Sequence, residues 1–142
     1  MAQLSLNVVT PERLVFQDQV DTVTLMTETG EITVLPGHLP LVTILRPGEM
    51  RLKKGGTESL LVVSTGFFEV RPGNQLFVLA DTAEHAEELE LEKIEGAKKA
   101  AERLMEEKRH VDDVAFAHAA AMLERELARY KVAVKKRHHP SA

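Results

Sequence analysis

The 142-residue chain contains no cysteine and no tryptophan, and it has a single tyrosine. The lack of cysteine excludes disulfide bonds, thiol catalysis and metal centres held by thiolates. With so few large aromatic side chains, the chain offers no platform for stacked bases and no aromatic cage for a cation. The 18 Lys and Arg are outnumbered by 22 Asp and Glu, which gives a formal net charge of −4. This acidic balance disfavours a general nucleic-acid-binding protein.

Long apolar runs are also missing, and so is an N-terminal targeting segment. The most apolar stretch, residues 34–45, is interrupted by two prolines and a glycine. It is far shorter than the ~20 residues that a membrane-spanning helix needs. Residues 1–9 contain no basic region followed by an apolar block and a cleavage site. We therefore expect a soluble chain that meets a membrane only through a partner.

The first part of the chain, residues 1–83, has the pattern of short β-strands. It holds every glycine except Gly96 and every proline except Pro140, and many of them form turn signals. Between the turns, apolar and polar residues alternate, which predicts strands with one buried face; the apolar runs 60–63 and 76–79 predict more deeply buried strands. The spacing predicts about ten strands in an antiparallel β-sandwich or barrel, and it disfavours a parallel nucleotide-binding sheet. The alternating apolar positions are Leu4, Leu6, Val8, Leu14, Phe16, Val23, Leu25, Met50 and Leu52.

Residues 84–142 have helical periodicity instead. Two sets of apolar residues recur every three to four positions, which predicts an antiparallel hairpin of two helices, each of roughly 25 residues. Asp112 is the expected N-cap of the second helix. Many facing positions are alanine, so little area is buried and the hairpin should need a partner surface. The predicted faces are Leu91, Ile94, Ala97, Ala101, Leu104 and Met105, and then Phe116, Ala119, Ala120, Leu123, Leu127, Tyr130 and Val134.

Charge is distributed unevenly over this helical part. Residues 84–95 carry six glutamates and one lysine, whereas residues 125–137 carry six basic residues and one glutamate. In an antiparallel hairpin the two segments lie side by side, and each has the sign that its helix end favours. Two explanations stay open: charge complementarity within the hairpin, and docking of the basic segment on an acidic partner surface.

Catalytic motifs are absent from the sequence. It has no Gly-x-x-x-x-Gly-Lys phosphate loop, no Gly-x-Ser-x-Gly elbow and no His-x-x-x-His pair. We therefore expect no catalytic residue and no metal site. His38 lies in a loop between two prolines, where it either hydrogen-bonds its own loop or contacts a partner. Prolines favour the second role because they hold a loop in place before binding.

Several sequence blocks carry a resemblance to a known family. The longest contains the run Pro-Gly-His-Leu-Pro-Leu, and the blocks follow one another in the family's order and spacing. They are residues 9–13, 30–48, 66–70 and 78–84. Over essentially the whole chain, the sequence closely resembles the epsilon subunit of bacterial and chloroplast F-type ATP synthase. Thr33 and Thr65 depart from the pattern, because the family often has glycine at these positions.

The resemblance implies a ten-stranded β-sandwich, residues 1–83, followed by a regulatory two-helix hairpin, residues 84–142. It implies a non-catalytic subunit that needs no cofactor, joins the gamma subunit in the central stalk and sits on the ring of c subunits. Proton-driven rotation is thereby coupled to ATP synthesis at the beta subunits. Glu31 is then expected to face the c ring, and His38 and Thr43 to face the gamma subunit. The implied location is the cytoplasmic side of a bacterial plasma membrane, since no mitochondrial transit peptide is present.

The resemblance also gives the hairpin a role in inhibiting ATP hydrolysis, when it extends along the gamma subunit. Basic side chains of the second helix are then expected to contact an acidic segment of a beta subunit, beside the alpha subunits. The candidates are Arg125, Arg129, Lys131, Lys135 and Lys136.

Some members of the family bind ATP on the folded hairpin, through an Ile/Leu-Asp-x-x-Arg-Ala motif and two arginines four residues apart. Here Glu90, Lys93 and Ile94 replace the Asp, Arg and Ala of that motif, whereas Arg125 and Arg129 match the pair. Their spacing places both guanidinium groups on one helix face, where they grip phosphates or pair with the acidic first helix. Lysine does not reproduce a bidentate arginine, so only weak regulatory ATP binding is implied. An ATP-binding sensor hairpin with little inhibitory role is the alternative function.

Overall fold

The computed structural model describes residues 2–109 and 111–138, and side chains up to Lys135. The chain divides into two compact units between Ala86 and Glu87. This division lies three residues after the predicted boundary at residue 83, because Glu84 and His85 continue as a β-strand. In the described part of the chain, no helix is both long and apolar enough to cross a membrane.

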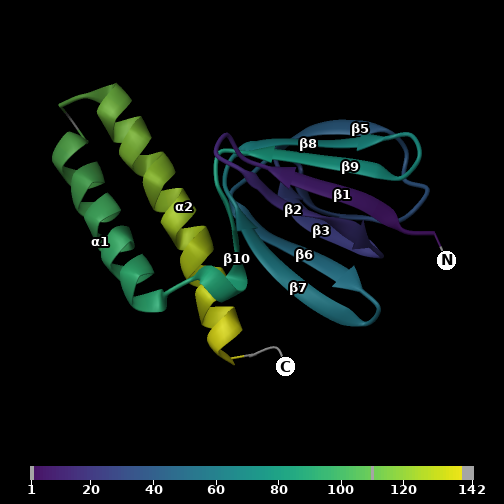
Figure 1. The fold of residues 1–142 in the computed structure, drawn as a ribbon. Helices are drawn as coiled ribbons and strands as arrows, with labels where there is room; N and C mark the ends of the chain where they lie inside the picture. The colour runs from purple at the N-terminus through teal and green to yellow at the C-terminus, as the bar shows by residue number, and fades with distance from the viewer. Residues whose placement is uncertain (1, 110, 139–142) are drawn as a thin grey trace. The chain divides into compact units, whose positions relative to one another are not determined.

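The first unit contains ten β-strands (Figure 1). Hydrogen bonds join them into one sheet in the order β10-β7-β6-β3-β5-β8-β9-β1-β2, and β4 pairs with β3. A single residue pair, Thr27 with Leu45, joins β3 to β5, so the sheet turns a corner there. The strands are β1 (Leu4–Val9), β2 (Leu14–Val20), β3 (Thr22–Thr27), β4 (Gly30–Val34), β5 (Leu41–Leu45), β6 (Gly48–Lys54), β7 (Thr57–Val63), β8 (Gly66–Arg71), β9 (Gln75–Ala80) and β10 (Ala83–His85).

The corner creates the two layers of a sandwich, which confirms the predicted fold class. We call them the β3 layer (β4, β3, β6, β7 and β10) and the β8 layer (β5, β8, β9, β1 and β2). The pairs are antiparallel, as expected, except that β1 runs parallel to β9. The predicted alternation accounts for most of the core: Leu4, Leu6, Val8, Val23, Leu25, Met50 and Leu52 are all buried. The prediction was wrong at Leu14, which is 52% exposed, and Phe16 is only partly buried. Burying each side chain of this size contributes roughly 1.5–3 kcal/mol.

The second unit is a helical hairpin, again as predicted. A short 3-10 helix (Ala86–Glu88) leads into α1 (Leu91–Lys108), and α2 follows (Asp113–His138). Helix α1 is shorter than expected because its predicted first residues lie in β10 and the 3-10 helix. The Asp112 side chain accepts hydrogen bonds from the backbone N–H groups of Val114 and Ala115, at 3.0 and 3.1 Å. Asp112 is therefore the N-cap that the sequence predicted.

Burial along the two helices confirms one predicted face and corrects the other. In α1, Ile94 and Ala101 are fully buried. Helix α2 lies antiparallel to it (Figure 1), with the Lys98 ammonium 4.9 Å from the centre of the Tyr130 ring. The prediction for Leu127 was wrong, because its side chain is 42% exposed and the neighbouring Glu126 is 2% exposed. A one-residue step rotates a helix by about 100°, which in α2 leaves Leu127 facing solvent while Glu126 is buried.

Candidate partner-binding surfaces

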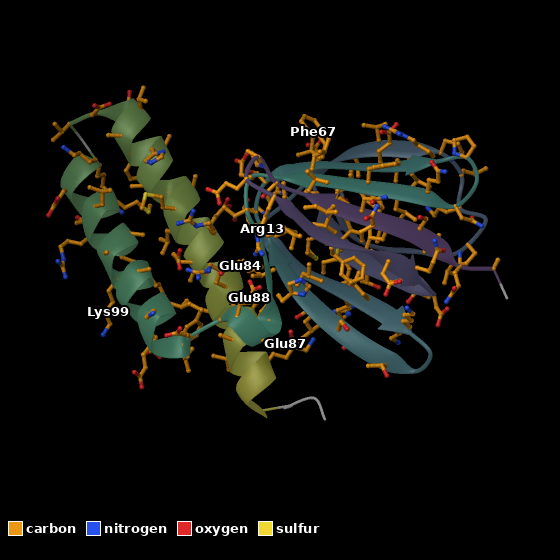
Figure 2. The ribbon with its side chains drawn as sticks, viewed as in Figure 1. Arg13, Phe67, Glu84, Glu87, Glu88 and Lys99 are labelled. Atoms are coloured by element: carbon orange, nitrogen blue, oxygen red, sulfur yellow. The ribbon has the colours of Figure 1, made fainter. Side chains whose placement is uncertain are left out.

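The outer face of the β8 layer carries a row of exposed apolar side chains. Strand register aligns Ile44, Phe67, Leu79 and Val9 on four neighbouring strands, and we call these residues the apolar row. Ile44, Phe67 and Leu79 are 45%, 57% and 56% exposed. Figure 2 shows the Phe67 ring pointing away from the sheet. Exposed apolar side chains on neighbouring strands make this face a candidate interaction site.

The register row beside the apolar row is mixed, with two apolar residues and one charged residue. The next register row contains Val42, Glu69 and Phe77, and Val42 is 67% exposed. The Arg71 guanidinium lies 4.1 Å from the centre of the Phe77 ring, and its Nη2 is 3.0 Å from a Glu69 oxygen. An apolar centre with a charged rim is the usual anatomy of a protein–protein interface.

The sequence did not reveal this surface. Residues 76–79 are all apolar and were predicted to form a deeply buried strand, but Leu79 is exposed and the prediction was wrong there. In β8, Phe67 and Phe68 are adjacent, and only Phe68 is buried. The sequence did contain a sign of this surface, because apolar residues occupy consecutive positions in these strands. Such a run fits a strand buried on both faces and equally a strand with one apolar face left for a partner.

Thr43 and His38 hold different positions relative to this surface. Thr43 pairs with the buried Phe68, so its side chain lies on the inner side of β5, between the exposed Val42 and Ile44. His38 lies in the loop between β4 and β5. Its backbone N–H donates to the Leu35 carbonyl at 3.1 Å, and its Nδ1 is 2.6 Å from the Leu39 carbonyl oxygen. The loop hydrogen bond expected for His38 is therefore present.

Glu31 belongs to a charged cluster on the β3 layer. Arg51 lies between two carboxylates, with Nη2 3.0 Å from Glu31 and Nη1 2.9 Å from Glu49. Hydrogen bonding to Glu49, and then to Glu31, raises the pKa of the Arg51 guanidinium above its ordinary value. The Glu31 side chain is 51% exposed, so it presents a fixed carboxylate to solvent.

The basic residues predicted to hold ATP already contact carboxylates. Glu90 and Lys93 pair with each other at 3.2 Å on the surface of α1. In α2, Arg129 donates to both oxygens of Glu126, at 3.1 and 2.8 Å, and Arg125 Nη2 lies 3.3 Å from Glu126 Oε1. We call Arg125, Glu126 and Arg129 the arginine cluster. Sequence reasoning treated Glu126 as a minor charge in a basic segment and missed its buried position.

The remaining candidates in α2 are lysines. Lys131 is exposed and Lys135 is half-buried, whereas the side chain of Lys136 lies outside the described residues. Within the described ranges, no group of three or more His, Asp or Glu residues is arranged to hold a metal ion.

Comparison with known proteins identifies first a domain class and then a family. Residues 3–86, the β unit, match the family model for the β-sandwich domain of the ATP synthase delta/epsilon chain. The ATP synthase epsilon chain of Dehalococcoides mccartyi is 47% identical over 99% of both chains. That of Halalkalibacterium halodurans is 41% identical over 94% of this chain and 98% of its own. The chain therefore belongs to the ATP synthase epsilon-chain family.

Solved structures resemble the whole chain, including the hairpin. A chain in the structure of the Euglena gracilis mitochondrial ATP synthase, which includes the c-ring, is 25% identical with a TM-score of 0.77. The match covers 98% of this chain and 83% of that one. A chain of the central stalk and c-ring of the Tetrahymena thermophila enzyme shares the fold, with a TM-score of 0.64.

Proposed function

We propose that this chain is a non-catalytic subunit of the central stalk of an F-type ATP synthase. In that role it joins the gamma subunit to the c ring and couples proton-driven rotation to ATP synthesis at the beta subunits. Family membership supports the proposal, and the apolar row is the observation in this chain that carries it. The complex is placed on the cytoplasmic side of a bacterial plasma membrane, where the chain reaches the membrane only through its partners. No nucleic acid and no cofactor is required.

The two layers of the sandwich suit different partners. We assign the apolar row, together with Val42 and the loop of residues 35–40 at the other end of β5, to the gamma subunit, because an apolar surface suits a permanent contact. Thr43 then acts through its exposed neighbours on β5. We assign Glu31 to the c ring, where Arg51 fixes the direction of its carboxylate. A sandwich with a large apolar core gives both contacts the rigid frame that a rotating shaft requires.

Substitution of Phe67 tests the gamma assignment. Phe67→Asp should lower the affinity for the gamma subunit by about 30-fold or more, since a charge replaces a central apolar contact. Isothermal titration calorimetry of the full chain with gamma measures this. Val114→Asp is the matched control, because Val114 is also an exposed apolar residue, at 80%, but lies in the hairpin. A Phe67→Asp chain that binds gamma as tightly as the wild type contradicts the assignment.

For the hairpin we propose inhibition of ATP hydrolysis. Its basic side chains Arg125, Arg129, Lys131, Lys135 and Lys136 are the candidates for contacting an acidic segment of a beta subunit, next to the alpha subunits. Removing residues 87–142 should raise the ATPase rate of the reconstituted complex. The cut falls after Ala86 because β10 pairs with β7 and belongs to the sandwich. An unchanged rate removes the inhibitory role.

ATP sensing by the hairpin remains the alternative. The contacts described above disfavour it, because the carboxylate of Glu126 lies where phosphate oxygens would have to meet Arg125 and Arg129. A calorimetric titration of the chain with ATP, with and without magnesium, tests the alternative directly.

A further inference from the structure

The loop between β4 and β5, residues 35–40, is tied to a distant turn. The backbone N–H of Gly37 donates to the side-chain oxygen Oδ1 of Asn74 at 2.7 Å, across 37 residues of sequence. The loop presents two exposed apolar side chains, Leu35 at 54% and Leu39 at 78%. The hydrogen bonds of His38 stay within the loop, so they shape it but do not hold it against the sheet.

Asn74 also connects this loop to the first strand. It lies in the turn between β8 and β9, and its backbone carbonyl accepts a hydrogen bond from the Ser5 N–H at 2.8 Å. Three segments that are distant in sequence therefore meet at one residue: the start of β1, the β8–β9 turn and the 35–40 loop. The Asn74 side chain forms the hydrogen bond to the loop, and the Asn74 main chain forms the hydrogen bond to β1.

The backbone conformation of Asn74 explains why asparagine suits this position. Its φ is +59°, in the left-handed region that non-glycine residues rarely adopt. Glycine would take this conformation without strain, but it offers no side-chain acceptor. Asparagine tolerates the left-handed region and also supplies a carbonyl oxygen that can reach a neighbouring N–H.

We propose that Asn74 is a positioning residue that fixes the 35–40 loop in the conformation in which it meets the gamma subunit. The inference rests on the proposed binding of gamma. A loop that is ordered before binding avoids the entropy cost of ordering its side chains in the complex. Asn74 thus acts through the loop: its side-chain oxygen holds Gly37, and the exposed Leu39 makes the contact.

Two substitutions of Asn74 distinguish the effect of its side chain from the effect of its backbone conformation. Asn74→Gly keeps the left-handed conformation and removes the acceptor. Asn74→Asp keeps an acceptor oxygen and still tolerates positive φ. We expect Asn74→Gly to weaken binding of gamma by about five-fold, the scale of one net hydrogen bond, and Asn74→Asp to restore it to within about two-fold of the wild type. Titration calorimetry with purified gamma and the full chain measures both.

A second readout follows the loop in the free protein. In Asn74→Gly, the backbone order parameters of residues 37–39 should fall from about 0.85 to below about 0.6 by NMR relaxation, while those of β8 and β9 stay unchanged. A role confined to folding would instead lower the thermal midpoint and loosen the neighbouring strands. Leu39→Ala should cost less affinity in the Asn74→Gly background than in the wild type, because a mobile loop already makes a poorer contact.

The outcomes distinguish this inference from the proposed function. If the wild-type chain does not bind gamma, the proposed function fails, whatever the loop does. If the wild type binds and Asn74→Gly binds equally well, the positioning role is overturned. It is also overturned if Asn74→Gly weakens binding while the loop stays ordered, since Asn74 then contacts gamma directly.

Discussion

The β unit and the helical hairpin bury their side chains in different ways. The core of the sandwich consists of large aliphatic side chains around Phe68, and its ion pairs lie at the surface. In the hairpin, three of the buried side chains are alanines, Ala101, Ala119 and Ala133, and a glutamate, Glu126, is buried with them beside Ile94 and Val132. Apolar burial grows with the area removed from water, so each of these alanines contributes less than a large side chain in the sandwich core.

This difference matches the roles proposed for the two units. A core of large apolar side chains holds the strands in fixed register, and a docking surface on its outer face then keeps its shape. Helices whose buried positions include several alanines separate at lower cost, as a regulatory element requires. Substitutions that remove a core ring, the buried charge or a helix cap test this comparison, from the largest expected effect to the smallest.

The largest effect is expected in the sandwich, at two neighbouring phenylalanines. Phe68→Ala should lower the free energy of unfolding by about 3–5 kcal/mol, because it leaves a cavity in a fully buried site. Phe67→Ala, one residue earlier on the exposed face, should change it by less than about 1 kcal/mol and weaken gamma binding instead. Chemical denaturation and gamma titration measure the two effects. Equal destabilisation by both substitutions would mean that the apolar row is part of the core.

An intermediate effect is expected at the arginine cluster. Glu126→Gln should destabilise the hairpin by about 1–2 kcal/mol, since a neutral amide replaces a carboxylate that accepts charge-assisted hydrogen bonds. The helical circular dichroism signal during denaturation reports this loss. Glu124→Gln, an exposed neighbour on the same helix, is the control and should cost less than about 0.5 kcal/mol.

The same variant tests ATP sensing. We expect the wild-type chain not to bind ATP at about millimolar concentration, and Glu126→Gln to gain binding because Arg125 and Arg129 lose their internal anion. Adding Arg129→Gln to the Glu126→Gln variant should abolish the gained ATP binding. Tight ATP binding by the wild type would contradict this reading of the arginine cluster and would favour the sensor function.

The sequence predicted the elements well where one physical rule dominated. Period-two alternation identified the buried face of β1, with Leu4, Leu6 and Val8, and helical periodicity identified the face of α1. Prediction from the sequence failed where two physical rules give the same pattern. The apolar residues of β8 and β9 fit a strand buried on both faces as well as a strand that binds a partner, so the exposure of Phe67 and Leu79 was not predictable.

The sequence also did not predict features that depend on contacts between residues distant in sequence. The parallel pairing of β1 with β9 joins strands from opposite ends of the β unit, and no local signal records it. The hydrogen bond from Gly37 to Asn74 belongs to the same group, because either residue alone indicates only a turn.

The smallest effect is expected at the N-cap of α2, where two neighbouring aspartates differ in one respect. Asp112 accepts hydrogen bonds from two backbone N–H groups at the helix start, whereas Asp113 is the first helical residue and contributes chiefly through its charge near the helix dipole. Asp112→Ala should therefore cost about 1 kcal/mol and Asp113→Ala about 0.3 kcal/mol in thermal denaturation followed by circular dichroism at 222 nm. Because several of the buried positions in the hairpin are alanines, a cap of this size is a substantial share of its stability. If removing the cap leaves the helix signal unchanged, packing dominates in the hairpin too, and the contrast between the two units is weaker than their buried side chains indicate.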